Sequence, residues 1–200
     1  MKNKNAVWIV KVAMLSAVAT VLMLFEFPIP FIAPAFYELD FSEVPVLIGA
    51  FALGPVAGVT IEGMKILLNL IINGTITAGI GEIANFITGV VFVFPAAFVY
   101  NRHKSRKRAI VGLVVGGVLM AVLGCFINAF VLLPAYSKAL KLPVDSIIGM
   151  AAKIWPVVDT MFEFVVMCVL PFNVIKIFLV STVTMLIYKP LSPLLKGKKQ

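Results

Sequence analysis

The chain consists of long apolar runs separated by short polar breaks. Four runs approach the roughly 20 apolar residues that cross a bilayer as a helix, and they cover 6–25, 86–100, 109–133 and 171–188. A fifth apolar stretch, Val44–Asn73, is interrupted by Gly54-Pro55 and by Gly58. Glycine and proline both favour a break, so this stretch forms either one broken helix or a hairpin of two short helices.

Composition supports a membrane protein. The chain is 62% hydrophobic and 13% charged, with a mean hydropathy of +1.08, whereas soluble domains average about 45–50% apolar and about 25% charged residues. Divided into spans of this length, its 200 residues leave no room for a separate soluble domain. We expect one multi-pass domain, residues 1–200, in the cell membrane. The first run has a basic start but no small-residue cleavage site, so we expect it to stay as a helix.

Basic residues distinguish the two interpretations of 44–73. They form three clusters: Lys2, Lys4 and Lys11; Arg102, Lys104, Arg106, Lys107 and Arg108; and Lys189, Lys196, Lys198 and Lys199. A hairpin places all three clusters on the cytoplasmic side, as the positive-inside rule requires, whereas a single broken helix does not. We therefore predict an all-α integral membrane fold of six transmembrane helices with both termini cytoplasmic. The predicted helices cover roughly 6–26, 44–55, 57–73, 82–101, 109–133 and 171–188, with an outer loop at 27–43 and a long outer loop at 134–170.

The distal part of the long loop is ambiguous. Val157–Leu170 is apolar, but it has only fourteen residues and carries Asp159 and Glu163. We expect it to lie against the outer face rather than to cross the bilayer. The alternative is that it extends the last helix through a kink at Pro171.

Several function classes fit poorly. The net charge of +8 would suggest nucleic acid in a soluble chain, but no basic platform interleaved with aromatic residues is present. His103, the single histidine, lies in a basic loop, so no His-based metal site or Ser–His pair can form at depth. Cys125 and Cys168 lie in apolar runs and are expected to be packing residues. We expect no enzyme, although paired acids such as Glu82 with Asp40 keep that alternative open.

Polar side chains recur in the outer halves of several predicted helices. Asn128 and Lys176 each lie five residues from the outer end of their helix, a depth of about 8 Å, and Asn173 shares a face with Lys176. The other polar positions are Lys65 and Asn69 in the third helix and Glu82 and Asn85 in the fourth. Polar groups at depth face protein, water or a ligand, so this distribution predicts a cavity open to the outside.

Each of these polar groups also has a simpler interpretation. A membrane Asn can join two helices, and a Lys near a helix end can extend to the interface. The loop acids Glu38, Asp40 and Glu43 can simply be solvated, and Glu26 lies at the interface. Glu62 either faces the inner hairpin turn or pairs within the bundle.

One stripe of small residues leads to Asn128. Gly117, Ala121 and Gly124 precede it at offsets that follow the 3.6-residue period of a helix. Small residues in membrane helices allow close helix packing. We expect the stripe either to contact a neighbouring helix or to leave space beside Asn128.

Five segments in order carry a family resemblance. They are Leu39–Pro45, Phe51–Gly58, Gly81–Phe86, Asn128–Pro134 and Pro171–Lys176. With them the chain resembles the S components, the substrate-binding subunits, of energy-coupling factor (ECF) vitamin transporters, and most closely their riboflavin-specific, RibU-type branch. The resemblance covers nearly the whole chain. It implies six helices around an outward pocket that the first outer loop closes.

The resemblance also implies a substrate site. It assigns Asn128, Asn173 and Lys176 to the flavin ring, Leu39 and Asp40 to the loop side, and Lys65, Asn69 and Asn85 to the region of the ribityl chain. The residue after Lys65 is Ile66, where family members often have Asn, so a polar contact at that position is in doubt. Asn amides suit the donor and acceptor edge of a flavin, and Tyr37, Phe41, Phe86 and Tyr136 offer stacking surface.

Partners follow from the same resemblance. The family docks its membrane partner on small residues of the first helix, and Ala13 and Ala17 have the matching Ala-x-x-x-Ala spacing. The chain has no Gly-x-x-x-x-Gly-Lys-[Ser/Thr] loop and cannot itself use ATP. The resemblance implies a coupling membrane protein and two ATPase subunits, with the binding subunit tipping in the bilayer to release riboflavin. No cofactor is expected, since riboflavin is the transported substrate.

Two alternative functions stay open. The chain could be an S component for FMN or another vitamin, since Lys65 and Lys176 leave a phosphate possible. It could also be a solitary secondary transporter, although such proteins usually show broken helices in both halves and only the Gly54–Gly58 break fits that pattern.

Overall fold

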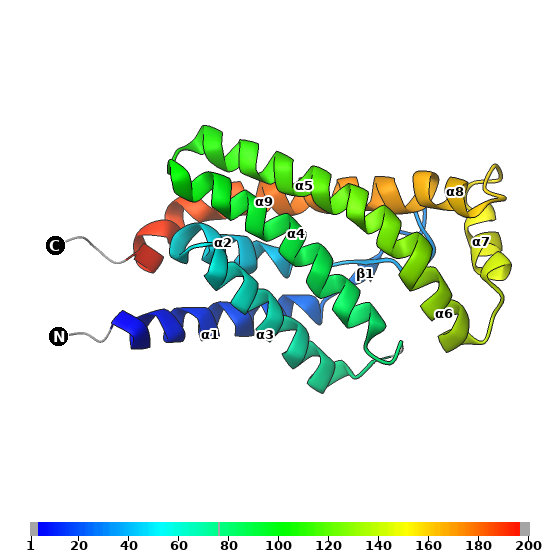
Figure 1. The fold of residues 1–200 in the computed structure, drawn as a ribbon, viewed down its shortest axis with the longest axis horizontal. Helices are drawn as coiled ribbons and strands as arrows, with labels where there is room; N and C mark the ends of the chain where they lie inside the picture. The colour runs from blue at the N-terminus through cyan, green and yellow to red at the C-terminus, as the bar shows by residue number, and fades with distance from the viewer. Residues whose placement is uncertain (1–3, 76, 197–200) are drawn as a thin grey trace.

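The computed structural model describes residues 4–75 and 77–196 as a bundle of helices (Figure 1). Lys2, Lys198 and Lys199 of the basic clusters lie outside the described residues. In chain order the elements are α1 Lys4–Met23, β1 Phe27–Pro28, β2 Glu38–Leu39, α2 Glu43–Leu53, α3 Pro55–Asn73, α4 Ile80–Arg102, α5 Arg106–Ile127, η1 Asn128–Leu132, α6 Leu133–Leu140, α7 Val144–Ala152, α8 Met161–Phe164, η2 Val165–Val169 and α9 Leu170–Lys196. The fold is mostly helical. The expected all-α fold is modified by β1 and β2, which pair antiparallel within the outer loop.

Within the described residues, five helical segments are long and apolar enough to cross a membrane. They are Asn5–Met23, Pro55–Asn73, Ile80–Arg102, Arg106–Ala139 and Met161–Leu191. The sixth predicted helix is α2, which has only 11 residues and is therefore about 16 Å long, roughly half of the hydrocarbon core. Every residue of α2 from Glu43 to Phe51 is buried, because α2 packs against α1, α3, α4 and α9.

The hairpin in 44–73 is confirmed. α2 ends at Leu53 and α3 begins at Pro55, the first helical position where proline loses no hydrogen bond. Gly54 between them has a φ of 109°, which a residue with a side chain rarely adopts. At Gly58 a side-chain carbon would lie 2.6 Å from Ala50 Cβ and 2.8 Å from Val93 Cγ1, so this glycine lets α2, α3 and α4 pack closely.

The long outer loop expected at 134–170 is instead largely helical. α5 continues through η1 into α6, and α8 continues through η2 into α9. The expectation that Val157–Leu170 lies outside the last helix was wrong from Met161 onward. A capping box at Thr160 and Glu163 begins this helix, so the acidic residue belongs to a helix start rather than to a surface segment.

Proline explains the shape of both continuous helices. The π-helical segments η1 and η2 each end two residues before a proline, Pro134 and Pro171. Proline has no N–H and its ring displaces the carbonyl four residues earlier, so the helix widens to an i→i+5 pattern instead of ending. Asn128 therefore lies 12 residues before the end of α6 and Lys176 lies 15 residues after the start of α8. These separations, about 18 Å and about 22 Å, exceed the expected 8 Å.

The first residues of α1, the α4–α5 loop and the last turns of α9 lie at one end of the bundle (Figure 1). The described parts of the three basic clusters therefore share this end, which we call the basic end. At the opposite end lie β1, β2, α6 and α7. The buried apolar side chains form one cluster toward each end, the first around Phe51 and Tyr100, and the second around Leu39 and Phe164.

Candidate binding pocket

A polar cavity of about 320 Å³ lies between the helices and the outer loop. Its polar lining includes five asparagines and one lysine from four helical segments: Asn69 and Asn73 of α3, Asn85 of α4, Asn128 of η1, and Asn173 and Lys176 of α9. These residues are far apart in sequence, so the cavity exists only in the assembled bundle. We call it the polar pocket.

Asn128 is held in place by two hydrogen bonds. Its Oδ1 accepts a bond from the Tyr37 hydroxyl at 2.6 Å, and its Nδ2 donates to the Gly124 carbonyl at 2.8 Å. Tyr37 comes from the outer loop, and burial raises the pKa of its phenol, so it stays a donor at neutral pH. The bond therefore ties the loop to the pocket wall.

Asn173 keeps an unsatisfied donor in the pocket. Its side chain is 8% exposed, and its Nδ2 has no hydrogen-bond partner among the described residues. Gly124 makes room for this amide, because a side-chain carbon there would lie 2.8 Å from Nδ2. At Gly117 on the same stripe, such a carbon would lie 2.6 Å from Ile177 Cγ2. Both expectations for the stripe are met: Gly117 and Gly124 pack closely on α9, and Gly124 also lines the polar pocket beside Asn128. A buried amide donor without a partner is costly, which makes it a candidate ligand contact.

Lys176 connects the pocket to the outer loop. Its Nζ donates to Asp40 Oδ2 at 2.9 Å, and Asp40 Oδ1 accepts a bond from the Ser42 backbone N–H at 2.7 Å. Burial alone would raise the pKa of Asp40, but the nearby ammonium groups of Lys176 and Lys65 hold it well below its usual range. The ion pair is therefore intact at physiological pH.

Lys65 lies in a separate buried cluster outside the pocket lining. Its Nζ lies 2.8 Å from Glu43 Oε1 and 2.8 Å from Glu62 Oε1, and all three side chains are at most 2% exposed. Glu62 thus pairs within the bundle, which resolves the alternative left open by the sequence. On the far side, Glu62 packs against Gly89 of α4. Removal of one of these three enclosed groups would change the charge balance of the other two, so the stability of the cluster depends on all three.

Carboxylates and aromatic rings form much of the remaining pocket wall. Glu26, Glu38 and Glu82 all line it. Lost hydration and the neighbouring Glu38 raise the pKa of Glu26 to about 7. The ring centroids of Phe36 and Tyr136 are 5.2 Å apart. Aromatic lining of this kind offers surface to a flat ligand.

The structure brings most predicted substrate residues together. Asn69, Asn85, Asn128, Asn173 and Lys176 line the polar pocket. Leu39 and Asp40 are buried behind it and are absent from its lining, as is Lys65. Of the predicted stacking residues, Tyr37 and Tyr136 line the pocket and Phe41 and Phe86 do not.

Sequence reasoning missed two features of this region. It did not pair Lys65 with Glu43, although the i,i+3 spacing of Glu62 and Lys65 on an apolar helix was a usable signal for half of the cluster. It also missed Phe36 and Phe172 in the pocket wall. No local pattern in the sequence distinguishes them from packing residues.

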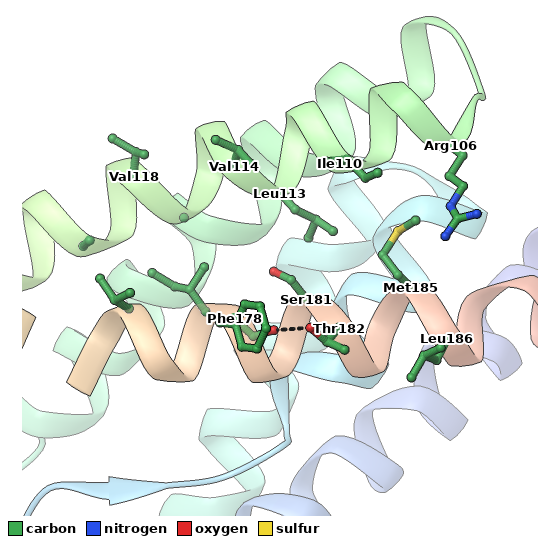
Figure 2. A pocket seen from close by; sticks show the side chains of 14 residues that line it. Arg106, Ile110, Leu113, Val114, Val118, Phe178, Ser181, Thr182, Met185 and Leu186 are labelled. Atoms are coloured by element: carbon green, nitrogen blue, oxygen red, sulfur yellow. Dashed lines mark hydrogen bonds between the residues drawn. The ribbon is translucent and has the colours of Figure 1, made fainter. Parts of the chain in front are cut away.

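Two further features lie away from the pocket. Ala13 and Ala17, the predicted docking residues, are exposed on α1. An apolar groove of about 570 Å³ runs between α5 and α9 (Figure 2). Within the described residues, no group of three or more His, Cys, Asp or Glu side chains could hold a metal ion. Because the groove is almost wholly apolar, the polar pocket is the candidate site for a polar substrate.

Comparison with known proteins identifies the family. The profile described as "ECF transporter, substrate-specific component" matches residues 8–188. The chain belongs to this family. The S component is a transporter subunit, so the chain is a membrane transport component rather than an enzyme.

Individual relatives agree with this placement. The chain is 36% identical over 194 residues to the riboflavin transporter FmnP of Bacillus subtilis (strain 168), covering 96% of this chain and 95% of the relative. It is 35% identical over 188 residues to the riboflavin transporter RibU of Staphylococcus aureus (strain TCH60), covering 94% and 92%. A solved structure described as "Structure and mechanism of the S component of a bacterial ECF transporter" has a TM-score of 0.74 and 34% identity, covering 97% of this chain and 100% of that one. The fold is therefore the S-component fold.

Proposed function

We propose that this protein is the high-affinity riboflavin-binding subunit of an ATP-driven ECF uptake transporter. The observation that carries the proposal is the polar pocket, where Asn128, Asn173 and Lys176 converge beneath a loop. Its relatives in Bacillus subtilis and Staphylococcus aureus are named riboflavin transporters.

The pocket suits a flavin chemically. A flavin ring is flat and carries donors and acceptors along one edge, and asparagine amides can match both kinds of group. The free Nδ2 of Asn173 supplies a donor, while Tyr37 and Tyr136 supply aromatic surface. Asn69 and Asn85 on the facing helices suit the hydroxyl groups of the ribityl chain. Leu39, Asp40 and Lys65 then act from behind the pocket, by positioning the loop and α3.

The charges of the pocket favour riboflavin over FMN. Glu26, Glu38 and Glu82 line it, whereas Lys176 is the one basic side chain in the described lining and is already paired with Asp40. A phosphate group would face three carboxyl groups, with little positive charge nearby to offset the repulsion. An uncharged ribityl chain meets no such repulsion.

The topology proposed for transport has six crossings, with α2 as a short sixth span and both termini in the cytoplasm. The positive-inside rule assigns the basic end to the cytoplasm, so the pocket opens to the outside. The protein then lies in the plasma membrane and captures riboflavin from the exterior.

Transport needs partners, because the chain has no phosphate-binding loop for ATP. We assign the exposed Ala13 and Ala17 face of α1 to the coupling membrane protein, which joins two ATPase subunits. Small residues there allow close approach of a partner helix. ATP use by these subunits drives the tipping that releases riboflavin inside.

The decisive experiment is riboflavin titration of the purified chain, followed by quenching of flavin fluorescence. We expect tight binding of riboflavin and much weaker binding of FMN. Lys176→Ala should weaken riboflavin binding by at least about tenfold, because it also leaves Asp40 buried without its partner. Phe178→Ala is the control, since Phe178 is 68% exposed and lies outside the pocket.

Two outcomes would contradict the proposal. Absence of riboflavin binding would reject the substrate, and equal, negligible effects of Lys176→Ala and Phe178→Ala would reject the site. Uptake assays with and without the ATPase subunits separate an ECF transporter from a solitary secondary transporter.

A further inference from the structure

The groove between α5 and α9 combines an apolar wall with a cation at one end. It has a volume of about 570 Å³. Its wall includes Ile110, Val118, Val174 and Phe178, and Arg106 lies at the end nearest the α4–α5 loop. In Figure 2 Arg106 extends from the first turn of α5 toward Met185 of α9.

The apolar part of the groove faces outward from the bundle. Phe178 and Leu186 are 68% and 71% exposed. The Thr182 hydroxyl uses its proton on the Phe178 carbonyl at 2.8 Å within its own helix. Ser181 adds one buried hydroxyl that has no partner among the described residues. Apart from these two hydroxyls the wall between the helices is apolar, so a hydrocarbon chain is the ligand that it accepts at the least desolvation cost.

The length of the groove matches one leaflet of a bilayer. Along α5 its lining runs from Arg106 to Ala121, a separation of 15 positions and therefore about 22 Å. A bilayer with its headgroups is about 40–45 Å thick, so one leaflet is about 20–22 Å. Arg106 then lies at headgroup level and Ala121 near the middle of the membrane. A partner helix that crossed the whole bilayer would extend far beyond such a groove.

The charged end of the groove suits a phosphate. Arg106 begins α5, and the first turn of this helix has basic residues and no acidic one. Arginine binds phosphate oxygens with two parallel hydrogen bonds, and a helix N-terminus adds a favourable dipole. The cation and the apolar surface therefore lie in the same order as the phosphate and acyl chain of one lipid.

We propose that the α5–α9 groove binds one anionic phospholipid, with its acyl chain along the apolar wall and its phosphate on Arg106. This site is separate from the polar pocket and does not depend on which substrate the pocket takes. Its ligand comes from the surrounding membrane rather than from the solution outside it.

Native mass spectrometry of the purified chain tests the proposal with phosphatidylglycerol and phosphatidylcholine added at equal concentrations. We expect one retained phosphatidylglycerol per chain and less phosphatidylcholine. Arg106→Gln should reduce phosphatidylglycerol retention about fivefold, the size expected for one basic residue near an anionic membrane surface. Arg108→Gln is the charge control, since Arg108 lies in the same turn but outside the groove lining. Arg106→Lys should keep most of the retention.

A second pair of variants tests the acyl chain. Ile110 and Val111 are adjacent and both 47% exposed, but only Ile110 lines the groove. Ile110→Trp should narrow the groove and reduce phosphatidylglycerol retention, whereas Val111→Trp should leave it unchanged. Circular dichroism melting of each variant in the same detergent verifies that it is folded.

Several results would overturn the site. Equal retention of the two lipids would show that the site does not recognise an anionic headgroup. Equal effects of Arg106→Gln and Arg108→Gln would show that Arg106 does not bind the phosphate. Displacement of the lipid by inorganic phosphate at matched concentration would show a simple anion site. If Ile110→Trp blocked assembly with the coupling membrane protein but left lipid retention unchanged, the groove would belong to a protein partner.

Discussion

Two groups of polar side chains, one toward each end of the bundle, differ in how far their hydrogen bonds are satisfied. At the basic end, the Tyr100 and Tyr188 hydroxyls lie 3.0 Å apart and satisfy each other, while Phe51 packs on both rings with centroid distances of 4.7 and 5.5 Å. The opposite end contains the polar pocket, and we call it the pocket end. There Asn128 and Lys176 use some of their hydrogen-bonding groups in contacts with the outer loop, and Asn173 keeps a free donor.

This difference indicates where a ligand belongs. Buried polar atoms that satisfy each other add rigidity and have no capacity left for binding. Buried polar atoms that remain incomplete cost stability until a ligand completes them. The Tyr100–Tyr188 pair is therefore a packing contact, and the pocket end is built for a ligand at some cost to the stability of the unliganded protein.

The largest effect is expected from breaking the buried Glu43–Lys65–Glu62 cluster. Lys65→Met keeps the aliphatic stem but leaves two enclosed carboxylates uncompensated, and we expect a loss of about 3–5 kcal/mol in stability, measured by thermal unfolding in detergent. The triple variant Glu43→Gln/Glu62→Gln/Lys65→Met removes all three charges and should recover much of this loss. A Lys65→Met protein as stable as an exposed Lys107→Met control would contradict the role of the cluster.

A smaller loss is expected where α4 packs on the same cluster. Gly89→Ala places a methyl group against the Glu62 carboxylate and should cost about 1–3 kcal/mol. Gly63→Ala is the matched control, because its methyl would lie 3.5 Å from Phe86 in ordinary contact. Since alanine favours helices over glycine, that control should be neutral or slightly stabilising. Similar melting temperatures for the two variants would rule out close packing at Gly89.

Removal of one hydroxyl at each end tests the comparison directly. Tyr37→Phe deletes the 2.6 Å bond to Asn128 and should weaken riboflavin binding about fivefold, the equivalent of about 1 kcal/mol. Tyr188→Phe deletes the contact with Tyr100 and should lower stability by about 1 kcal/mol without changing riboflavin affinity. Titration and melting of both variants measure the two effects. If Tyr188→Phe weakened binding as much as Tyr37→Phe, the two ends would not be functionally distinct.

The smallest effect is a pH dependence at the pocket rim. The pKa of Glu26 rises from an ordinary 4.5 to about 7, so its protonated form contributes stability that is fully present below about pH 4.5. That contribution is lost as pH rises through about 7. It should stay below about 1 kcal/mol, because Glu26 lies in the pocket wall but keeps a solvent-exposed side, where water screens its charge. Glu26→Gln should make the melting temperature depend less on pH between pH 5 and pH 8, whereas Asp145→Asn should leave this dependence unchanged. If the melting temperature of Glu26→Gln depended on pH as in the unmodified protein, Glu26 would not be the group responsible for this dependence.

Much of the fold was predictable because its signals are local. Gly54-Pro55 marked the hairpin, and the basic clusters predicted that α1, the α4–α5 loop and α9 share one end. The error at 134–170 has a physical cause. Pro134 and Pro171 are ordinary helix-ending signals, but here π-helical segments absorb each proline and the helices continue.

The candidate site was predictable only in part. Asn128, Asn173 and Lys176 were recognisable as polar groups at depth in two segments of the chain, and they do share a cavity. The placement of Lys65 was not recognisable, because half of its cluster comes from Glu43 on another helix.

The amino-acid sequence by itself determined that this chain is a membrane protein, that residues 44–73 break at Gly54-Pro55, and which residues are too polar to face lipid. These properties depend on neighbouring residues and on the solvent around them. Only the tertiary structure decided the partners of those polar residues. Lys176 meets Asp40 across 136 positions of the chain, and no local pattern encodes a contact that exists only once the helices have packed.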